Sequence, residues 1–313
     1  MTQLSQDRQG RYVVTVMGRG LSGKALGAVT SLLEKYGLVV DGRRALSANW
    51  DETGTGNACL ELRVAGRLED EGTFRTASIA LAAESGIDLA IQPEGEYGRA
   101  RRLAVFDMDS TLIQGEVIDE LARLAGVGER VSAVTAAAMR GEIEFQESFR
   151  RRVALLEGLP EAQVRELLGR IPLMHGAERL FRTLKQRGFK TAILSGGFTF
   201  FGAHLDQILG VDHIYANVLE ISDGLVTGQV NAPIVDGARK AALLQEIAAS
   251  EEVALDQTVA VGDGANDLPM LRLAGMGVAF HAKPVVRAEA KFSLSVLGLD
   301  SLLYLLGIPD WEW

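Results

Sequence analysis

The sequence predicts an α/β protein in which a parallel sheet carries an inserted helical cap and is preceded by a smaller domain. Three short apolar runs, Leu103–Phe106, Thr191–Leu194 and Thr258–Val261, each end at a polar residue or at glycine. Such runs are typical of strands that are buried on both faces of a parallel sheet. The stretch between the first two runs has helical patterns and is far longer than the roughly 30 residues of a plain βαβ unit. Before them, residues 1–95 show strand and helix patterns of their own.

The composition is that of an ordinary globular protein. The 313 residues are 47% hydrophobic and 23% charged, enough for two or three domains with cores of their own. The net charge of −9 argues against a nucleic-acid partner, which needs a basic surface. No apolar run approaches the roughly 18 residues of a membrane span, and the polar N-terminus shows no signal peptide, so no membrane partner is expected. A single cysteine, Cys59, excludes an internal disulfide, and we expect a cytoplasmic protein.

The N-terminal domain is predicted to span residues 1–95 with the element order βαββαβ, the ferredoxin-like arrangement. Strand patterns occur at Tyr12–Met17, Leu38–Leu46, Asn57–Val64 and Ile87–Ile91, helical patterns at Ser22–Tyr36 and Leu68–Ser85, and a turn at Trp50–Gly54. Its one acid cluster, Glu69–Glu71, opens the second helix, where negative charge suits the helix dipole. The domain contains no histidine, and we expect no catalytic role for it. The polar link Gln92–Gly98 is the expected boundary.

In element order this domain resembles the ACT domain, a small module that often binds amino acids and regulates metabolic enzymes. The loop in which ACT domains hold a ligand usually contains an Asp and a Pro-Gly pair, whereas here it is Gly18–Gly23. The domain is therefore interpreted as a dimerisation or packing module, or else as an amino-acid sensor. We expect a chain that begins near Glu94 to fold and keep its chemistry, but to lose a homodimer that forms through this domain.

Two carboxylates, Asp107 and Asp109, follow the first apolar run directly. In an extended chain their side chains lie on one side, toward the crevice in which parallel sheets bind ligands. Two acids so close repel each other and need a cation or a shared proton. The pair is interpreted either as a solvated turn or, because Ser110 and Thr111 follow, as a site of Mg²⁺-assisted phosphoryl transfer.

Residues 115–175 are predicted to form the helical cap. Its four amphipathic segments are Val117–Ala125, Glu129–Arg140, Glu144–Glu157 and Glu161–Arg170. In the third segment, Arg152 lies about two turns after Phe145 and therefore falls within an apolar stripe, whereas the two preceding arginines point elsewhere. A guanidinium on an inward face needs an anionic partner. The spacing leaves two alternatives equal, a structural salt bridge and a clamp for a substrate carboxylate.

Polar residues also follow the other two apolar runs. Ser195 and Gly196 end the second run, where a hydroxyl and free N–H groups suit phosphate oxygens. Asp263 and Asp267 follow the third run, and carboxylates are ligands that Mg²⁺ prefers. Between these runs Lys240 lies on the inward face of a predicted helix, where a lysine needs an anion. Together these residues are a set of groups suited to phosphoryl transfer by positioning and charge neutralisation.

These residues resemble the four motifs of the haloacid dehalogenase superfamily. The matching stretches are Asp107–Thr111, Ser195–Phe198, Lys240 and Gly262–Pro269. The resemblance runs from about Arg101 to Gly307. It implies a doubly wound, Rossmann-like α/β core with a helical cap, within a domain of residues 96–313, and it implies Mg²⁺ as the cofactor.

The resemblance also implies a role for each site residue. Asp107 is the nucleophile that forms an aspartyl-phosphate, and Asp109 is the acid and then the base. The implied Mg²⁺ ligands are Asp107, Asp109 through its backbone carbonyl, Asp263 and Asp267. The implied substrate contacts are Glu116, Phe145, Arg152, Ser195, Gly196, Lys240 and Asn266.

Within the superfamily, the cap residues Glu116, Phe145 and Arg152 resemble the substrate-reading positions of the phosphoserine phosphatase family. This resemblance implies hydrolysis of O-phospho-L-serine to L-serine and phosphate, the last step of serine biosynthesis. Two enzyme alternatives stay open: a phosphotransferase acting on another alcohol such as homoserine, and a phosphatase for another small phosphomonoester. A third alternative is a non-catalytic amino-acid sensor.

Overall fold

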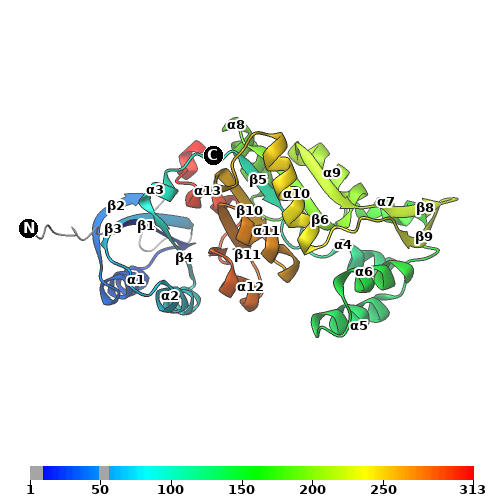
Figure 1. The fold of residues 1–313 in the computed structure, drawn as a ribbon, viewed down its shortest axis with the longest axis horizontal. Helices are drawn as coiled ribbons and strands as arrows, with labels where there is room; N and C mark the ends of the chain where they lie inside the picture. The colour runs from blue at the N-terminus through cyan, green and yellow to red at the C-terminus, as the bar shows by residue number, and fades with distance from the viewer. Residues whose placement is uncertain (1–9, 49–55) are drawn as a thin grey trace, which may run out of the picture. The chain divides into compact units, whose positions relative to one another are not determined.

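The computed structural model describes residues 10–48 and 56–313 (Figure 1). They form two compact units, one of the residues up to 100 together with 292–313, and the other of residues 101–291. The turn that was predicted at Trp50–Gly54 lies outside the described residues. None of the described helices has both the length and the apolar character to cross a membrane.

The first unit contains an antiparallel sheet with the strand order β2-β3-β1-β4. Its elements are β1 (Gly10–Arg19), α1 (Gly23–Lys35), β2 (Leu38–Ala45), β3 (Asn57–Gly66), α2 (Glu71–Ser85) and β4 (Ile87–Pro93). The predicted order βαββαβ is therefore confirmed. Ser22 caps α1 by accepting the Ala25 N–H at 3.2 Å, and Asp70 caps α2 by accepting the Thr73 N–H at 2.8 Å. A short helix, α3 (Glu94–Tyr97), lies in the segment that was predicted as a link.

The C-terminal residues 292–313 group with the first unit, whereas the predicted domain 96–313 places them with the core. They form β12 (Phe292–Leu294), η3 (Leu299–Ser301), α13 (Leu302–Leu305) and η4 (Asp310–Glu312). By the alternation along β4, the buried Asp88 and Gln92 lie on the sheet face opposite the one that packs on α1 and α2. Asp88 accepts two backbone N–H groups of the C-terminal segment at 2.8 and 2.9 Å, and Gln92 donates to the Leu305 carbonyl at 3.0 Å. The segment packs here because these buried polar groups need partners.

The second unit is built on a parallel sheet with the strand order β11-β10-β5-β6-β7. The strands are β5 (Leu103–Phe106), β6 (Lys190–Phe198), β7 (His213–Asn217), β10 (Thr258–Gly262) and β11 (Met276–Phe280). Around them lie α8 (Ala177–Gln186), α9 (Thr199–Leu209), α10 (Gly237–Ser250), η1 (Leu255–Gln257), η2 (Ala265–Asp267), α11 (Leu268–Leu273) and α12 (Pro284–Glu289). Strand residues Val105 and Leu194 pack in one core with α10 to α12, whereas the Phe106 ring lies 4.9 Å from that of Phe181 on α8. Helices thus cover both faces, as a doubly wound fold requires.

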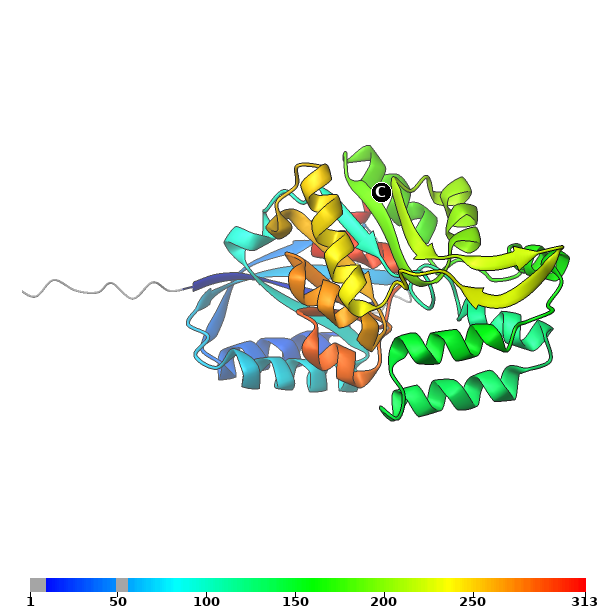
Figure 2. The same ribbon diagram turned by 45° about the vertical axis from the view of Figure 1, so that its right-hand side comes forward.

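A helical cap follows β5, as predicted (Figure 1). Its helices are α4 (Val117–Leu124), α5 (Gly128–Met139), α6 (Phe145–Ala154) and α7 (Glu161–Leu167). A hairpin of β8 (Leu219–Ser222) and β9 (Leu225–Val230) joins the cap, and Figure 2 shows it beside these helices. The Gly158 N–H donates to the Val226 carbonyl at 2.8 Å, and the Val226 N–H donates to the Leu159 carbonyl at 2.9 Å. The cap therefore contains residues 219–230 in addition to the predicted 115–175.

Candidate active site

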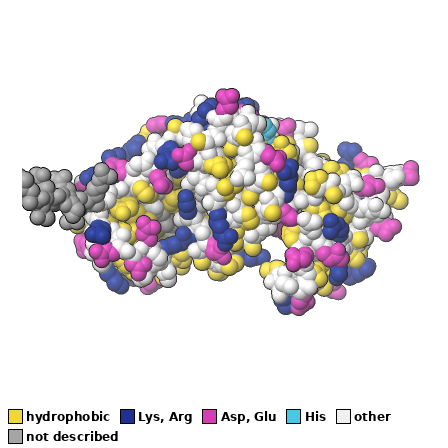
Figure 3. All heavy atoms as spheres, viewed as in Figure 1, with side chains coloured by type: hydrophobic (Ala, Val, Ile, Leu, Met, Phe, Trp, Pro, Cys, Tyr) yellow, Lys and Arg dark blue, Asp and Glu magenta, His cyan; other side chains and the backbone are white. Residues whose placement is uncertain are grey.

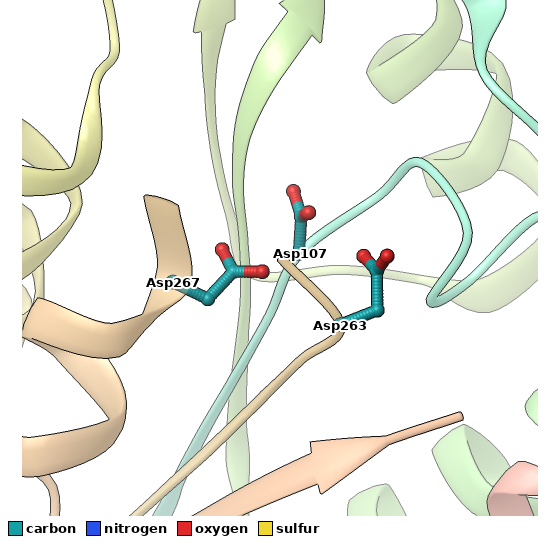
Figure 4. Close-up of side chains that lie close together, drawn as sticks. All are labelled: Asp107, Asp263 and Asp267. Atoms are coloured by element: carbon teal, nitrogen blue, oxygen red, sulfur yellow. The ribbon is translucent and has the colours of Figure 1, made fainter. Parts of the chain in front are cut away.

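Three carboxylates converge at the carboxyl ends of β5 and β10. Oxygen atoms of Asp107, Asp263 and Asp267 all lie within 4.8 Å of one another (Figure 4). Asp107 directly follows β5, and Asp263 directly follows β10, so the parallel register of the two strands brings them together. Burial and the charge of Asp267 raise the pKa of Asp263 to about 7. A set of donors that consists only of carboxylate oxygens fits a divalent metal ion of the hard, oxygen-seeking kind.

Lys240 lies behind this cluster and is buried. Its Nζ donates to Asp107 Oδ1 at 2.7 Å and to Asp267 Oδ1 at 2.6 Å. Burial, followed by the charge of Asp267, raises the pKa of Asp107 well above its usual range, although Lys240 opposes this. One lysine charge among three carboxylates leaves negative charge uncompensated, and a bound cation would offset it. Asp236 caps α10 by accepting the Arg239 N–H at 2.9 Å, and this fixes the start of the helix that carries Lys240.

The Asp109 carboxylate lies outside the cluster, which contains the three side chains predicted to hold the metal, Asp107, Asp263 and Asp267; Asp109 was predicted to contribute only its backbone carbonyl. Its Oδ1 accepts the Val117 N–H at 2.9 Å. Burial and the charge of Glu116 raise the pKa of Asp109 to about 8, which suits a group that donates a proton near neutral pH. A Cβ atom at Gly197 would lie 2.5 Å from Asp109 Oδ2, so this position needs glycine. In the sequence, the pair Gly196-Gly197 after the run Thr191–Leu194 indicated such a requirement.

Ser195 and Gly196 lie within β6, which continues past the predicted end at Leu194. Ser195 Oγ is buried and accepts the Gly197 N–H at 2.8 Å. Asn217, which the sequence analysis missed, donates from Nδ2 to the Gly196 carbonyl at 2.8 Å. Its Oδ1 accepts the Val235 N–H at 2.9 Å, so one amide ties the end of β6 to the chain just before α10. No local pattern marks Asn217, because its role depends on two segments that are distant in sequence.

A cavity of about 590 Å³ lies between the core and the cap. The predicted residues that line it are Asp107, Asp109, Glu116, Phe145, Arg152, Gly196, Asp263 and Asn266. Ser195, Lys240 and Asp267 do not line it but are buried behind these residues. The cavity opens between α5 and α12, where Figure 3 shows an indentation of the surface. None of the four histidines lines the cavity.

The cap supplies further charged groups that line the cavity. Glu116 directly precedes α4, its Oε1 accepts the Ser110 hydroxyl at 3.2 Å, and burial raises its pKa. Arg152 lies on α6 with its guanidinium 5.9 Å from the centre of the Phe149 ring. Within residues 10–48 and 56–313, Arg152 forms no ion pair, so the alternative of a structural salt bridge is not supported. Burial lowers the pKa of Arg152, and the charge of Glu116 opposes this.

Comparison with known proteins identifies relatives over nearly the whole chain. The family model described as "haloacid dehalogenase-like hydrolase" matches residues 104–272. The phosphoserine phosphatase of Streptomyces coelicolor is 47% identical over 303 residues, which are 97% of this chain and 72% of that protein. Phosphoserine phosphatase SerB2 of Mycobacterium tuberculosis is 44% identical, over 96% of this chain and 72% of that protein.

Solved structures resemble the chain in fold. A haloacid dehalogenase family hydrolase from Salmonella enterica serovar Typhi superposes with a TM-score of 0.81 at 31% identity, covering 94% of this chain and 98% of that one. A probable phosphoserine phosphatase from Vibrio cholerae in its unliganded form superposes with a TM-score of 0.75 at 34% identity, covering 100% and 90%.

Proposed function

Because the chain belongs to the phosphoserine phosphatases of the haloacid dehalogenase-like hydrolases, we propose that it hydrolyses O-phospho-L-serine to L-serine and phosphate. One observation carries the proposal. A single cavity is lined by the phosphoryl-transfer groups Asp107 and Asp109 of the core, which we call its phosphate end, and by a cation and an anion of the cap, Arg152 and Glu116, which we call its amino-acid end. Phosphoserine has a phosphate at one end, and both a carboxylate and an ammonium at the other.

The carboxylate of Asp107 attacks phosphorus. A bond forms between its oxygen and phosphorus while the bond from phosphorus to the serine oxygen breaks. Asp109, protonated because of its raised pKa, gives its proton to the departing serine oxygen. Asp109 then takes a proton from the water that attacks the aspartyl-phosphate, so that phosphate leaves and Asp107 is restored. Ser195, the Gly196 N–H and Lys240 donate to the phosphoryl oxygens in both steps.

We propose Mg²⁺ as the metal, held by the carboxylates of Asp107, Asp263 and Asp267 and by the Asp109 backbone carbonyl. The buried cluster with its excess of negative charge supports a small divalent cation. When bound, Mg²⁺ neutralises phosphoryl charge and lets the anionic nucleophile approach an anionic substrate.

At the other end of the cavity, Arg152 pairs with the substrate carboxylate and Glu116 pairs with its ammonium. Phe145 covers the phosphate end, because its Cζ lies 3.3 Å from the position that a Cβ of Gly196 would occupy. Asn266 lines the cavity on the same side as the metal cluster and is a further substrate contact. This arrangement shields the aspartyl-phosphate from bulk water.

The test is phosphate release from phosphoserine, O-phosphoethanolamine and a phosphomonoester that lacks both charged groups, each with Mg²⁺ and with EDTA. We expect phosphoserine to be preferred and EDTA to abolish release. Release of phosphate from the simple ester at the same kcat/KM would contradict the assigned substrate. If added homoserine were phosphorylated in place of water, the enzyme would be a phosphotransferase instead. No turnover at all with Mg²⁺ would favour the amino-acid sensor.

For the first unit we propose a ferredoxin-like, ACT-like domain that forms a homodimer, with amino-acid sensing as the second candidate. Its element order and its sheet order support this fold. β2 is an edge strand of the described sheet, and Val39 on it is 64% exposed, so this edge supports pairing with a second copy. Light scattering on the protein and on Val39→Lys, beside activity with and without serine, tests both roles. The predicted cytoplasmic location stays a prediction.

A further inference from the structure

Ser148 is a buried residue on α6 whose hydroxyl has no partner among the described residues. It is 1% exposed and lines the cavity. A serine inside a helix commonly donates to the carbonyl four residues earlier, which here belongs to Glu144. That carbonyl accepts the backbone N–H of Ser148 at 2.9 Å, but Ser148 Oγ has no hydrogen-bond partner. A buried polar atom without a partner is destabilising, so its presence next to a ligand cavity needs an explanation.

A second unpartnered donor lies one turn away on the same helix. Arg152 Nε is also buried without a hydrogen bond. Residues four apart on a helix are neighbours, so the two donors belong to one face of α6. The other two arginines of this run are engaged on the surface, Arg150 with Gln146 and Arg151 with Glu147. The cavity-facing side of α6 therefore carries two free donors.

A carboxylate matches these two donors. It has two oxygens and only accepts hydrogen bonds, whereas a serine hydroxyl and an arginine Nε–H both donate. An ammonium would instead be drawn to Glu116 and Asp119, which also line the cavity. The substrate group that belongs beside Ser148 is thus the carboxylate and not the ammonium.

We propose that Ser148 is a substrate-binding residue whose hydroxyl donates to the carboxylate of the phosphorylated amino acid beside Arg152. The inference rests on the proposed function, because it assigns the carboxylate of that substrate a second ligand. Rotation about the Ser148 Cα–Cβ bond turns the hydroxyl from the helix surface into the cavity, and the bound substrate then satisfies it. The residue thereby helps the enzyme to select a phosphorylated amino acid over a phosphorylated amino alcohol.

The experiment compares Ser148→Thr with Ser148→Val, which have the same shape and differ in the hydroxyl. The two substrates are O-phosphoserine and O-phosphoethanolamine, which keeps the phosphate and ammonium but lacks the carboxylate. We expect Ser148→Val to lower the ratio of kcat/KM for phosphoserine over phosphoethanolamine about tenfold, through KM, and Ser148→Thr to keep it within about twofold. Ser148→Ala, which adds no bulk, gives the same comparison if the larger side chains do not fit.

Thr183 supplies a matched control. It is fully buried on α8, and its Oγ1 has no partner in the part of the chain that the structure describes, but it does not line the cavity. Thr183→Val should leave the substrate ratio unchanged. If Ser148→Val and Ser148→Ala kept the wild-type ratio, the inference would be wrong. If the wild-type protein itself showed no preference for phosphoserine, the proposed function would fail instead, so the two failures are distinguishable.

Discussion

The two ends of the active-site cavity differ in how well their polar groups are satisfied. At the phosphate end, Lys240 bonds two carboxylates, and Asp109 accepts a backbone N–H. At the amino-acid end, Arg152 Nε and Ser148 Oγ have no partners within residues 10–48 and 56–313. The first set is carried by strand ends and by a helix of the core, and the second by a cap helix.

The difference shows how chemistry and recognition are divided between core and cap. A nucleophile and its counter-ions must be held in place before the reaction, because reorganisation of charged groups would raise the barrier. Recognition groups on the cap gain partners only when the substrate binds, and this couples specificity to cap closure. Changes at the phosphate end should therefore reduce turnover for every substrate, whereas changes at the amino-acid end should alter selectivity.

The largest effect is expected for Asp107→Asn. The substitution keeps the shape but removes the nucleophile, so kcat should fall by several orders of magnitude for phosphoserine and phosphoethanolamine alike. Single-turnover assays with Mg²⁺ measure the loss, and circular dichroism checks the fold. Residual activity within about tenfold of wild type would contradict an aspartyl-phosphate.

Arg152→Lys should affect selectivity far more than chemistry. Lysine keeps the charge but loses the planar fork that binds a carboxylate through two hydrogen bonds. We expect the ratio of kcat/KM for phosphoserine over phosphoethanolamine to fall on the order of a hundredfold. Arg151→Lys is the matched control, because Arg151 pairs with Glu147 on the surface and does not line the cavity. An equal loss with both substrates would assign Arg152 a structural role.

The sequence revealed the phosphate end more completely than the amino-acid end. Asp107 and Asp263 follow apolar runs, and Lys240 interrupts a helical stripe, so local patterns identify all three. Ser148 was missed because a small polar residue on a helix is unremarkable until the burial of its hydroxyl is known. Asn217 was missed because it joins segments that meet only in the folded chain.

The position of the C-terminal segment, residues 292–313, is the feature that the sequence pattern predicts least well. The segment's leucines predict burial but not where the segment lies, and its backbone bonds Gln92 and Asp88 of the N-terminal sheet. A fragment that begins near Glu94 would therefore lose these hydrogen bonds. The expectation that such a fragment folds unchanged is not supported.

Removal of the metal should make stability fall as pH rises. Burial and the neighbouring acids raise the pKa of Asp109 to about 8 and that of Asp263 to about 7. Between the ordinary carboxyl pKa of about 4 and these values, the folded state holds protons that the unfolded state has lost. The free energy of unfolding therefore decreases with rising pH across this window.

Mg²⁺ should reverse this trend, because it binds the ionised carboxylates of the folded state. Thermal unfolding with EDTA at about pH 5 and about pH 8 should show a Tm several degrees lower at the higher pH, and saturating Mg²⁺ should remove the difference. In EDTA, Asp263→Asn should flatten the pH dependence, since it deletes one of the titrating groups. If the Tm in EDTA rose between these pH values, the ionised carboxylates of the cluster would not be destabilising the folded state.

The smallest effect is expected at a hydrogen bond between the cap and the core. Gln146 on α6 donates from Nε2 to Asp236 Oδ2 at 2.7 Å, and Asp236 caps the helix that carries Lys240. This hydrogen bond holds the cap to the core beside the cavity. Gln146→Leu should raise KM for phosphoserine about threefold with little change in the chemical step, because the closed cap loses one hydrogen bond to a carboxylate. Gln146→Glu should raise it further, since two carboxylates then face each other.

Glu147→Gln is the control for Gln146, because Glu147 lies next to it on α6 and, among the described residues, bonds Arg151 alone. Its KM should match that of the wild type. Stopped-flow measurement of phosphate release separates cap opening from chemistry, and the Gln146 variants should change only the opening step. If Gln146→Leu slowed single-turnover chemistry as much as steady-state turnover, the contact would be part of the catalytic geometry. The hydrogen bond between Gln146 and Asp236 would then serve catalysis as well as cap closure, and core and cap would not divide these two tasks as argued above.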